Sequence, residues 1–374
     1  MAKKVSKKAG KSTGISLEDF MADLSKDENF VDLNNMEEEF YKFDDFSLNR
    51  ALGGGLPAGQ IYALQGPSGA GKTLMALDLA RTVIEAGKRV FYFDVENKIS
   101  VMALEHFGLY KNPNFIIFSV GVLEDALEKM FDAIESELFG LIIIDSVDAL
   151  TTDEQEERDI HDGSKVGGYK AKVLSEWLGS VKYKAAKHGC SIGLIRQVRD
   201  NVGVMYGNPE TTSGGKAIEF YATTVLRVGR SKGLDVEVDG KIIYQGATIK
   251  ILKMNQGALP NAAVEVRFYI GDDAPWGFDK FTSVFEEAKR LGVLAPAKKG
   301  SSKYLPCPQL CERLDRSEEE ISFNGKEKTM YALKNDEELY DAVCEILEEA
   351  GGKPVVAGEE DEDLAVDFEE DFDE

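Results

Sequence analysis

The chain has 374 residues, 43% hydrophobic and 30% charged, which is typical of a soluble globular protein of about two domains. Its 44 basic and 67 acidic residues give a formal net charge of −23. That charge excludes broad electrostatic coating of nucleic acid or of an anionic membrane, but it leaves room for a local DNA-binding groove. Four cysteines are too few for a disulfide framework. Because the sequence shows neither a signal peptide nor an apolar run of about 20 residues, it predicts a cytoplasmic protein without a membrane partner.

The two ends of the chain carry opposite charge. Residues 1–12 contain five lysines and no acid, and residues 359–374 contain eleven acids and no base. We expect a disordered basic arm over 1–16 and a disordered acidic tail over 357–374, which either competes with DNA for a basic groove or only aids solubility. Residues 17–46 are more apolar and are predicted to pack, either on their own core or on a neighbouring subunit. Their apolar residues are Phe20, Met21, Phe30, Leu33, Phe40, Tyr41, Phe43 and Phe46.

From residue 60 onward, short apolar runs alternate with helical patterns, which predicts an α/β fold with a mostly parallel sheet. Strands are expected at 60–65, 89–95, 115–120, 141–145 and 190–196, and helices at 72–86, 123–138 and 169–187. Later runs at 224–230, 247–252 and 264–270 have no long helical pattern between them, so we expect an antiparallel edge.

After residue 278 the pattern changes to a smaller α+β unit. It predicts a helix at 282–291, a basic loop with Lys298, Lys299 and Lys303, a hairpin at residues 324–325, and a helix at 336–349. The expected domains are an N-terminal segment over 1–46, an α/β core over 47–278, a small C-terminal domain over 279–356, and the acidic tail.

Residues 66–73 match the phosphate-loop pattern G-x-x-x-x-G-K-[ST] between a predicted strand and a predicted helix. In such a loop, backbone N–H groups surround phosphate oxygens and the helix N-terminus adds partial positive charge. The sequence therefore predicts a site for ATP and Mg²⁺, in which Lys72 reaches the β- and γ-phosphates and the Thr73 hydroxyl ligates the metal. The loop consists of Gly66, Pro67, Ser68, Gly69, Ala70, Gly71, Lys72 and Thr73.

Carboxylates stand at the carboxyl ends of two strands of the predicted sheet. Asp145 ends the apolar run 141–145 and is expected to hold Mg²⁺ through water. Glu96 follows the strand 89–95, where a carboxylate can orient and deprotonate the water that attacks the γ-phosphate. Asp94 is the alternative base, because strand alternation places it on the same face. Glu96 is favoured, since it lies nearer the carboxyl end of the strand and its side chain is longer.

The segment 196–216 follows a buried strand and is rich in glycine, with basic residues at its rims and apolar residues at its tip. A loop of about 20 residues is uncommon inside a compact domain and usually has a function. Side chains from such a loop can insert between stretched bases of single-stranded DNA. The alternative is a lid over the nucleotide.

Together these runs resemble the RecA family of DNA recombinases, and within it the T4-type phage recombinases. The resemblance covers roughly residues 46–291 and is carried by residues 51–59, the phosphate loop, Glu96, the pair Asp145 and Ser146, and the run Gly-Asn-Pro-Glu-Thr-Thr-Ser-Gly-Gly at 207–215. It implies a helical filament on single-stranded DNA that binds ATP at subunit interfaces, pairs with homologous duplex and exchanges strands. It also implies a single-strand-binding protein and a loader as partners.

The resemblance assigns roles residue by residue. Glu96 matches the catalytic glutamate, and Gln197 matches a residue that senses the γ-phosphate and couples it to a DNA loop. Lys253 matches the first of two lysines that reach the neighbouring subunit's phosphates, and Tyr269 resembles an aromatic residue near the base. The two DNA loops would be 156–168 and 199–216. The expected DNA contacts are Arg158, Lys165, Arg199, Met205, Tyr206, Asn208, Gly214, Gly215 and Lys216.

The chain departs from the family pattern at several positions. Asn255 stands where the second trans lysine is expected, which leaves Lys216 as a possible substitute, and Ala103 stands where a tyrosine stacks on adenine. Glu219 replaces a lysine, and the first DNA loop is acidic. A hexameric helicase motor and a DNA-independent oligomeric ATPase switch are the alternative functions.

Overall fold

The computed structural model describes residues 16–27, 38–153, 167–200, 210–212, 216–254 and 262–351, and it divides the chain between Glu39 and Phe40. The N-terminal unit contains helix α1 (Leu17–Leu24), whose first turn is capped by the Ser16 hydroxyl. Leu17, Phe20 and Met21 on this helix are exposed. None of the helices in the described ranges is both long and apolar enough to cross a membrane.

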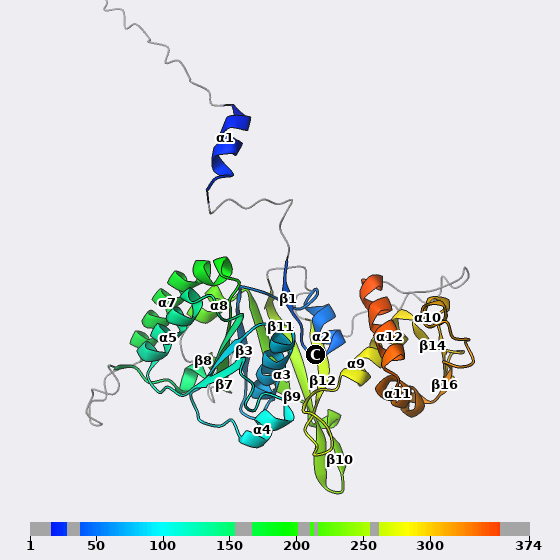
Figure 1. Ribbon diagram of the computed structural model, residues 1–374. Helices are drawn as coiled ribbons and strands as arrows, with labels where there is room; N and C mark the ends of the chain where they lie inside the picture. Colours follow the sequence, from blue (N-terminus) through cyan, green and yellow to red (C-terminus); the bar gives the residue numbers. More distant parts are fainter. Residues whose placement is uncertain are drawn as a thin grey trace, which may run out of the picture. The chain divides into compact units, whose positions relative to one another are not determined.

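The second unit is built on a mixed sheet, several strands of which are labelled in Figure 1. The described strands of this sheet occur in the order β13-β12-β11-β9-β3-β7-β6-β4-β5. The strands from β5 to β9 pair in parallel, and those from β9 to β13 pair antiparallel, so the predicted α/β fold with an antiparallel edge is confirmed. The strands are β3 (Ile61–Gly66), β4 (Val90–Asp94), β5 (Phe115–Phe118), β6 (Leu141–Asp145), β7 (Ser191–Asp200), β8 (Glu210–Thr212), β9 (Thr224–Arg230), β10 (Val236–Val238), β11 (Lys241–Met254), β12 (Ala263–Tyr269) and β13 (Gly277–Phe278).

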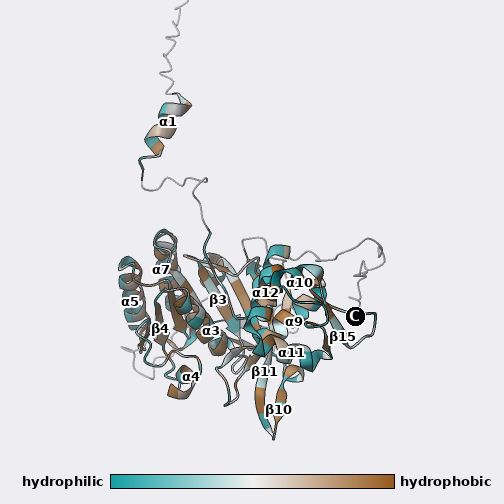
Figure 2. Ribbon diagram, turned by 45° about the vertical axis from the view of Figure 1, so that its right-hand side comes forward, coloured by the Kyte–Doolittle hydropathy of each residue, from teal (hydrophilic) through white to brown (hydrophobic). Residues whose placement is uncertain are grey.

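Helices cover both faces of the parallel strands, which is why the central residues of those strands are mostly apolar. In β3, Tyr62 and Leu64 pack with α3 (Lys72–Glu85), whereas Ile61 and Ala63 point to the opposite face. That face packs against α5 (Leu123–Glu135) and α7 (Gly167–Lys187), which contact each other. Figure 2 shows that the central strands carry mostly hydrophobic residues, whereas the helices around them show both kinds.

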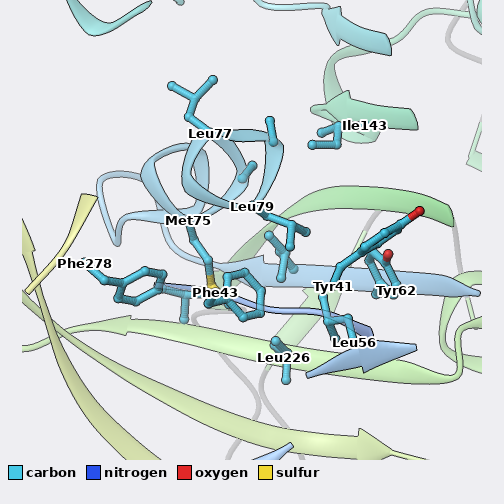
Figure 3. Packing of buried hydrophobic residues seen from close by; sticks show 14 of the residues in the cluster. Tyr41, Phe43, Leu56, Tyr62, Met75, Leu77, Leu79, Ile143, Leu226 and Phe278 are labelled. Carbon is cyan, nitrogen blue, oxygen red and sulfur yellow. The ribbon is translucent and has the colours of Figure 1, made fainter. Parts of the chain in front are cut away.

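The residues just after Glu39 belong to this core. Strand β1 (Phe40–Tyr41) pairs with β2 (Leu56–Pro57), and Tyr41 and Phe43 are 2% and 3% exposed. The Phe43 ring packs edge-on against Phe278 at 5.8 Å, beside Met75 of α3 (Figure 3). The boundary expected after residue 46 therefore lies before residue 40, because these aromatic side chains complete the subunit's own core. Phe30 and Leu33 lie outside the described residues.

The C-terminal residues form a separate core cluster of apolar side chains. The hairpin expected at residues 324–325 is wrong: β16 (Phe323–Asn324) pairs back to β15, and Gly325 uses its positive φ of 96° to begin a helix. The elements of this part are α9 (Lys280–Leu291), β14 (Leu294–Pro296), β15 (Lys303–Pro306), α10 (Pro308–Leu314), β16, α11 (Lys326–Asn335) and α12 (Glu337–Ala350).

A buried carboxylic acid makes the stability of this unit depend on pH. Asp45 caps the short helix α2 (Phe46–Ala51) through its Oδ1, which accepts a hydrogen bond from Leu48 N at 2.8 Å. Asp45 is 3% exposed, and burial raises its pKa from 3.8 to about 7. Because the folded state then holds this proton more tightly than the unfolded chain, the contribution to stability is full below about pH 4 and is lost as pH rises to about 7.

Asp45→Asn keeps a capping oxygen and removes the buried charge. We expect this variant to be more stable than the wild type at pH 8 by about 2–4 kcal/mol, and to show a flatter stability profile between pH 4 and 7. Urea denaturation between pH 4 and pH 8 measures both the difference in stability at pH 8 and the slope of each stability profile. Parallel profiles for the two proteins would contradict the expectation.

Candidate active site

The phosphate loop joins β3 to α3 and needs its glycines for two local reasons. At Gly66, a Cβ atom would lie 2.1 Å from the carbonyl oxygen of Val228 on the neighbouring strand, so only glycine fits. Gly71, which precedes α3, has φ of 106°, a conformation that other residues rarely adopt. The loop therefore brings backbone close to β9 and presents the N-terminus of α3, as a phosphate site requires.

Lys72 lies in the first turn of α3 and its side chain folds back over the loop. Its Nζ donates hydrogen bonds to the carbonyl oxygens of Gly66 at 2.8 Å and Pro67 at 2.7 Å. Burial lowers the pKa of this ammonium, while the nearby carboxylates, Asp145 foremost, act in the opposite direction. The side chain is thus a partly desolvated cation placed where a phosphate group would bind.

Two oxygen atoms next to the loop have the character of magnesium ligands. The Thr73 hydroxyl donates to Asp145 Oδ2 at 2.6 Å, and the Tyr92 hydroxyl donates to the same oxygen at 2.9 Å. Burial raises the pKa of Asp145, and these two hydrogen bonds oppose that shift. A hydroxyl and a carboxylate are hard oxygen donors of the kind that Mg²⁺ prefers, so this pair fits the predicted metal.

Glu96 lies in the turn after β4, at the same edge of the sheet. Its Oε1 accepts a hydrogen bond from the Ser146 hydroxyl at 2.8 Å, and its Oε2 pairs with Lys98 Nζ. The hydrogen bond from Lys98 is the largest cause that holds the pKa of Glu96 below its usual value. The carboxylate is therefore ionised at neutral pH, as a base must be.

Asp94, the alternative base, has a structural task. Its two carboxylate oxygens accept hydrogen bonds from the backbone N–H groups of Lys98 and Ile99, at 3.1 and 3.2 Å. These bonds fix the turn that carries Glu96. Asp94 is 8% exposed, so its oxygens are less free than those of Glu96 to receive a proton from water.

Gln197 reaches the pocket from β7, the strand that pairs with β3. In the pairing of β3 with β7 it lies opposite Gly66, and its backbone N–H donates to Asp148. The cavity has a volume of about 260 Å³ and unites most of the predicted nucleotide residues. It is lined by Ser68, Gly69, Gly71, Lys72, Thr73, Leu74, Asp94, Glu96, Lys98, Asp145, Ser146, Gln197 and Gln245.

Sequence reasoning missed Leu74, Lys98 and Gln245 in the lining of this pocket, and also Tyr92, which contacts Asp145. Lys98 could have been noticed as a basic residue two positions after Glu96. Gln245, whose Nε2 donates to the Gly69 carbonyl at 3.4 Å, lies on β11, which begins earlier than the expected strand at 247–252. Tyr92 carries no sequence signal, because an apolar strand gives no indication that its hydroxyl reaches Asp145.

Gly66, Pro67 and Ala70 of the phosphate loop do not line this pocket, and neither do the two predicted nucleotide residues outside the loop and the carboxylate strands. Tyr269 packs edge-on against Tyr244 at 5.2 Å and lines a separate cavity of about 1140 Å³. Lys253 Nζ donates to the carbonyl oxygens of Glu219 and Phe220, at 2.9 and 3.1 Å, at the end of α8 (Ala217–Tyr221). Neither placement tests a contact made across a subunit interface.

Most of the predicted DNA contacts fall outside the described residues. Arg199 lies on β7 opposite Thr211 of β8, although its side chain is not described. Lys216 is exposed and immediately precedes α8. The positions outside the described residues are Arg158, Lys165, Met205, Tyr206, Asn208, Gly214, Gly215 and the departure at Asn255.

The phosphate loop, the magnesium-type oxygens and the adjacent carboxylate lie together at the carboxyl edge of a mostly parallel sheet, and these features define a P-loop ATPase. The family model of the RecA N-terminal domain matches residues 27–273, so the chain belongs to the RecA family. Protein RecA of Deinococcus radiodurans is 31% identical over 318 residues, covering 83% of this chain and 81% of that protein. Protein RecA of Thermus thermophilus is 31% identical over 317 residues, covering 84% and 86%. Family membership indicates an ATP hydrolase of DNA recombination and repair.

Proposed function

We propose that the chain is a recombinase that binds single-stranded DNA as a helical filament, hydrolyses ATP in response to that DNA, and exchanges strands with a homologous duplex. The observation that carries this proposal is the path of β7. The strand starts in the sheet, passes the nucleotide pocket at Gln197, and ends in a ribbon with β8 that belongs to the second predicted DNA loop.

This path supports coupling between nucleotide and DNA. Val198, Arg199 and Asp200 pair with Thr212, Thr211 and Glu210, directly after Gln197. A displacement of Gln197 toward a γ-phosphate would move the ribbon, because the paired strands are joined by backbone hydrogen bonds. Conversely, DNA that fixes the ribbon would favour one position of Gln197, since such coupling is reciprocal.

In the proposed hydrolysis, Glu96 orients a water molecule toward the γ-phosphorus and receives its proton. As the water oxygen bonds to phosphorus, the bond to the bridging oxygen breaks and ADP carries the charge away. Lys72 and the N–H groups of the phosphate loop stabilise charge on the phosphate oxygens. Mg²⁺, held by Thr73 and through water by Asp145, would neutralise part of that charge.

The position of Lys253 supports an assembly in which subunits share a site. In the pairing of β11 with β9, Lys253 lies opposite Val225, and Val225 lies opposite Ala63 of β3. Ala63 is three residues before Gly66, the first residue of the phosphate loop. That separation is about 10 Å along a strand, so the lysine lies away from its own phosphate loop. We propose that it contacts the nucleotide of a neighbouring subunit, with Tyr269 near the base and the exposed apolar residues of α1 docked on the next subunit.

The finer features stay predictions from the sequence and from the resemblance. These are the T4-type branch, the single-strand-binding protein and loader as partners, the cytoplasmic location, and the role of the acidic tail. Family membership does not favour the helicase motor or the DNA-independent switch.

The experiment is ATP hydrolysis by the full chain with and without single-stranded DNA, with duplex DNA in parallel. We expect strong stimulation by single strands, which weakens as salt is raised because phosphate contacts release counterions. Hydrolysis that is equal in all three conditions would contradict the proposal and favour an ATPase switch that does not use DNA.

A further inference from the structure

We propose that Lys98 is a positioning residue of the nucleotide pocket, which holds Glu96 when ATP is not bound and moves its ammonium to the terminal phosphate when ATP binds. The exchange would free Glu96 to accept a proton from water only when there is a phosphate to attack. This inference rests on the proposed role of Glu96 as the base.

The contacts of Glu96 show why it needs to be freed. Its Oε1 accepts from the Ser146 hydroxyl at 2.8 Å, and its Oε2 pairs with Lys98 Nζ. A carboxylate has about four lone-pair sites, so these two donors leave room for a water molecule, but the adjacent ammonium makes Glu96 a weaker base toward that water. The Ser146 hydroxyl is neutral and can stay in place, so Lys98 is the contact whose removal restores basicity.

The backbone around Lys98 is held while its side chain is free to move. The N–H groups of Lys98 and Ile99 donate to Asp94, and the Ser119 hydroxyl donates to the Asn97 side chain at 2.7 Å. The Lys98 side chain, by contrast, is 70% exposed. A lysine has four rotatable bonds and three donors, so its ammonium can change partners without any change in the turn.

The pocket supplies the second partner. Among the described residues that line it, Lys72 and Lys98 are the two basic ones, against the three acids Asp94, Glu96 and Asp145. A terminal phosphate brings more negative charge than one carboxylate, so it attracts an ammonium at the rim of the same pocket more strongly. ADP lacks the γ-phosphate of ATP, so we expect Lys98 to strengthen the binding of ATP but not of ADP.

The test measures binding of a non-hydrolysable ATP analogue and of ADP by calorimetry, with Mg²⁺ and without DNA. For Lys98→Ala we expect about 5- to 20-fold weaker binding of the analogue, less than about twofold change for ADP, and recovery of most of the loss in Lys98→Arg. Steady-state hydrolysis should show the same factor in KM for ATP, with a smaller change in kcat.

Lys129→Ala is the matched control, because Lys129 forms an exposed ion pair with Asp132 on α5, outside the pocket. Unchanged binding of both nucleotides in Lys98→Ala would overturn the proposal and show that the contact of Lys98 with Glu96 is only a surface ion pair. Equal weakening of both would also overturn it, since that pattern indicates general damage to the pocket. The binding test needs neither DNA nor hydrolysis, so it separates failure of this proposal from failure of the proposed function.

Discussion

Glu96→Gln is expected to lower the rate of ATP hydrolysis about 100- to 10,000-fold, the usual effect of losing a general base. The amide keeps an oxygen that can accept the hydrogen bond from Ser146, so the turn should survive. It cannot accept a proton from water, however, and it no longer pairs with the Lys98 ammonium. Binding of ATP and of single-stranded DNA should therefore persist while turnover is lost.

The measurement is single-turnover hydrolysis with saturating single-stranded DNA, beside direct titration of both ligands. Glu312→Gln serves as the control, since it makes the same chemical change at an exposed position of α10. If Glu96→Gln retains hydrolysis within tenfold of the wild type, Glu96 is not the base. Asp94→Asn would then be the next variant to measure.

Arg81→Met is expected to destabilise the fold by about 3–5 kcal/mol, because it leaves a buried carboxylate without its partner. The Asp78 side chain is fully buried and pairs with Arg81 Nη2 at 2.8 Å, while Asp44 lies 3.0 Å from the same nitrogen. Burial raises the pKa of Asp78 to about 6, and the Arg81 charge opposes that shift. Without Arg81 the pKa rises further.

Because the pKa of Asp78 rises further in Arg81→Met, the loss of stability of this variant should grow with pH. Below about pH 4, Asp78 is protonated in both the folded and the unfolded chain, so the loss of stability should be smallest there and grow as pH rises. Chemical denaturation at pH 5 and pH 8 measures the difference. Arg313→Met is the control, since Arg313 pairs with Glu345 and Glu349 on the surface and should matter much less. Equal losses in the two variants would contradict the account.

Several features of the site could be predicted because each depends on local sequence. The strand Leu141–Asp145 has the predicted bounds, since a short run of four apolar residues is typical of a strand buried on both faces. The phosphate loop is confirmed between β3 and α3 for a similar reason: its glycines and lysine lie within eight consecutive residues. The parallel order of strands then brings Asp145, Glu96 and Gln197 to the same edge.

The features that escaped prediction depend on contacts between distant segments. The pair of Arg81 with Asp44 links α3 to a segment expected to belong to another domain, and no pattern along the chain indicates it. The sequence predicts a hairpin turn at residues 324–325, but a glycine with positive φ serves equally well at a hairpin turn and before a helix such as α11. Beyond residue 197, strand β7 pairs with β8 and not with the central strands, and no pattern along the chain indicates that pairing.

The most direct test of the central claim is homologous pairing by the purified full chain. Single-stranded DNA would be incubated with the protein, ATP and Mg²⁺, and then given a labelled duplex of either matching or unrelated sequence. We predict joint molecules with the matching duplex only, and none from Lys72→Ala, which lacks the lysine that we expect to bind the phosphates. Absence of joint molecules from a wild-type protein that hydrolyses ATP on single-stranded DNA would contradict the assignment as a recombinase.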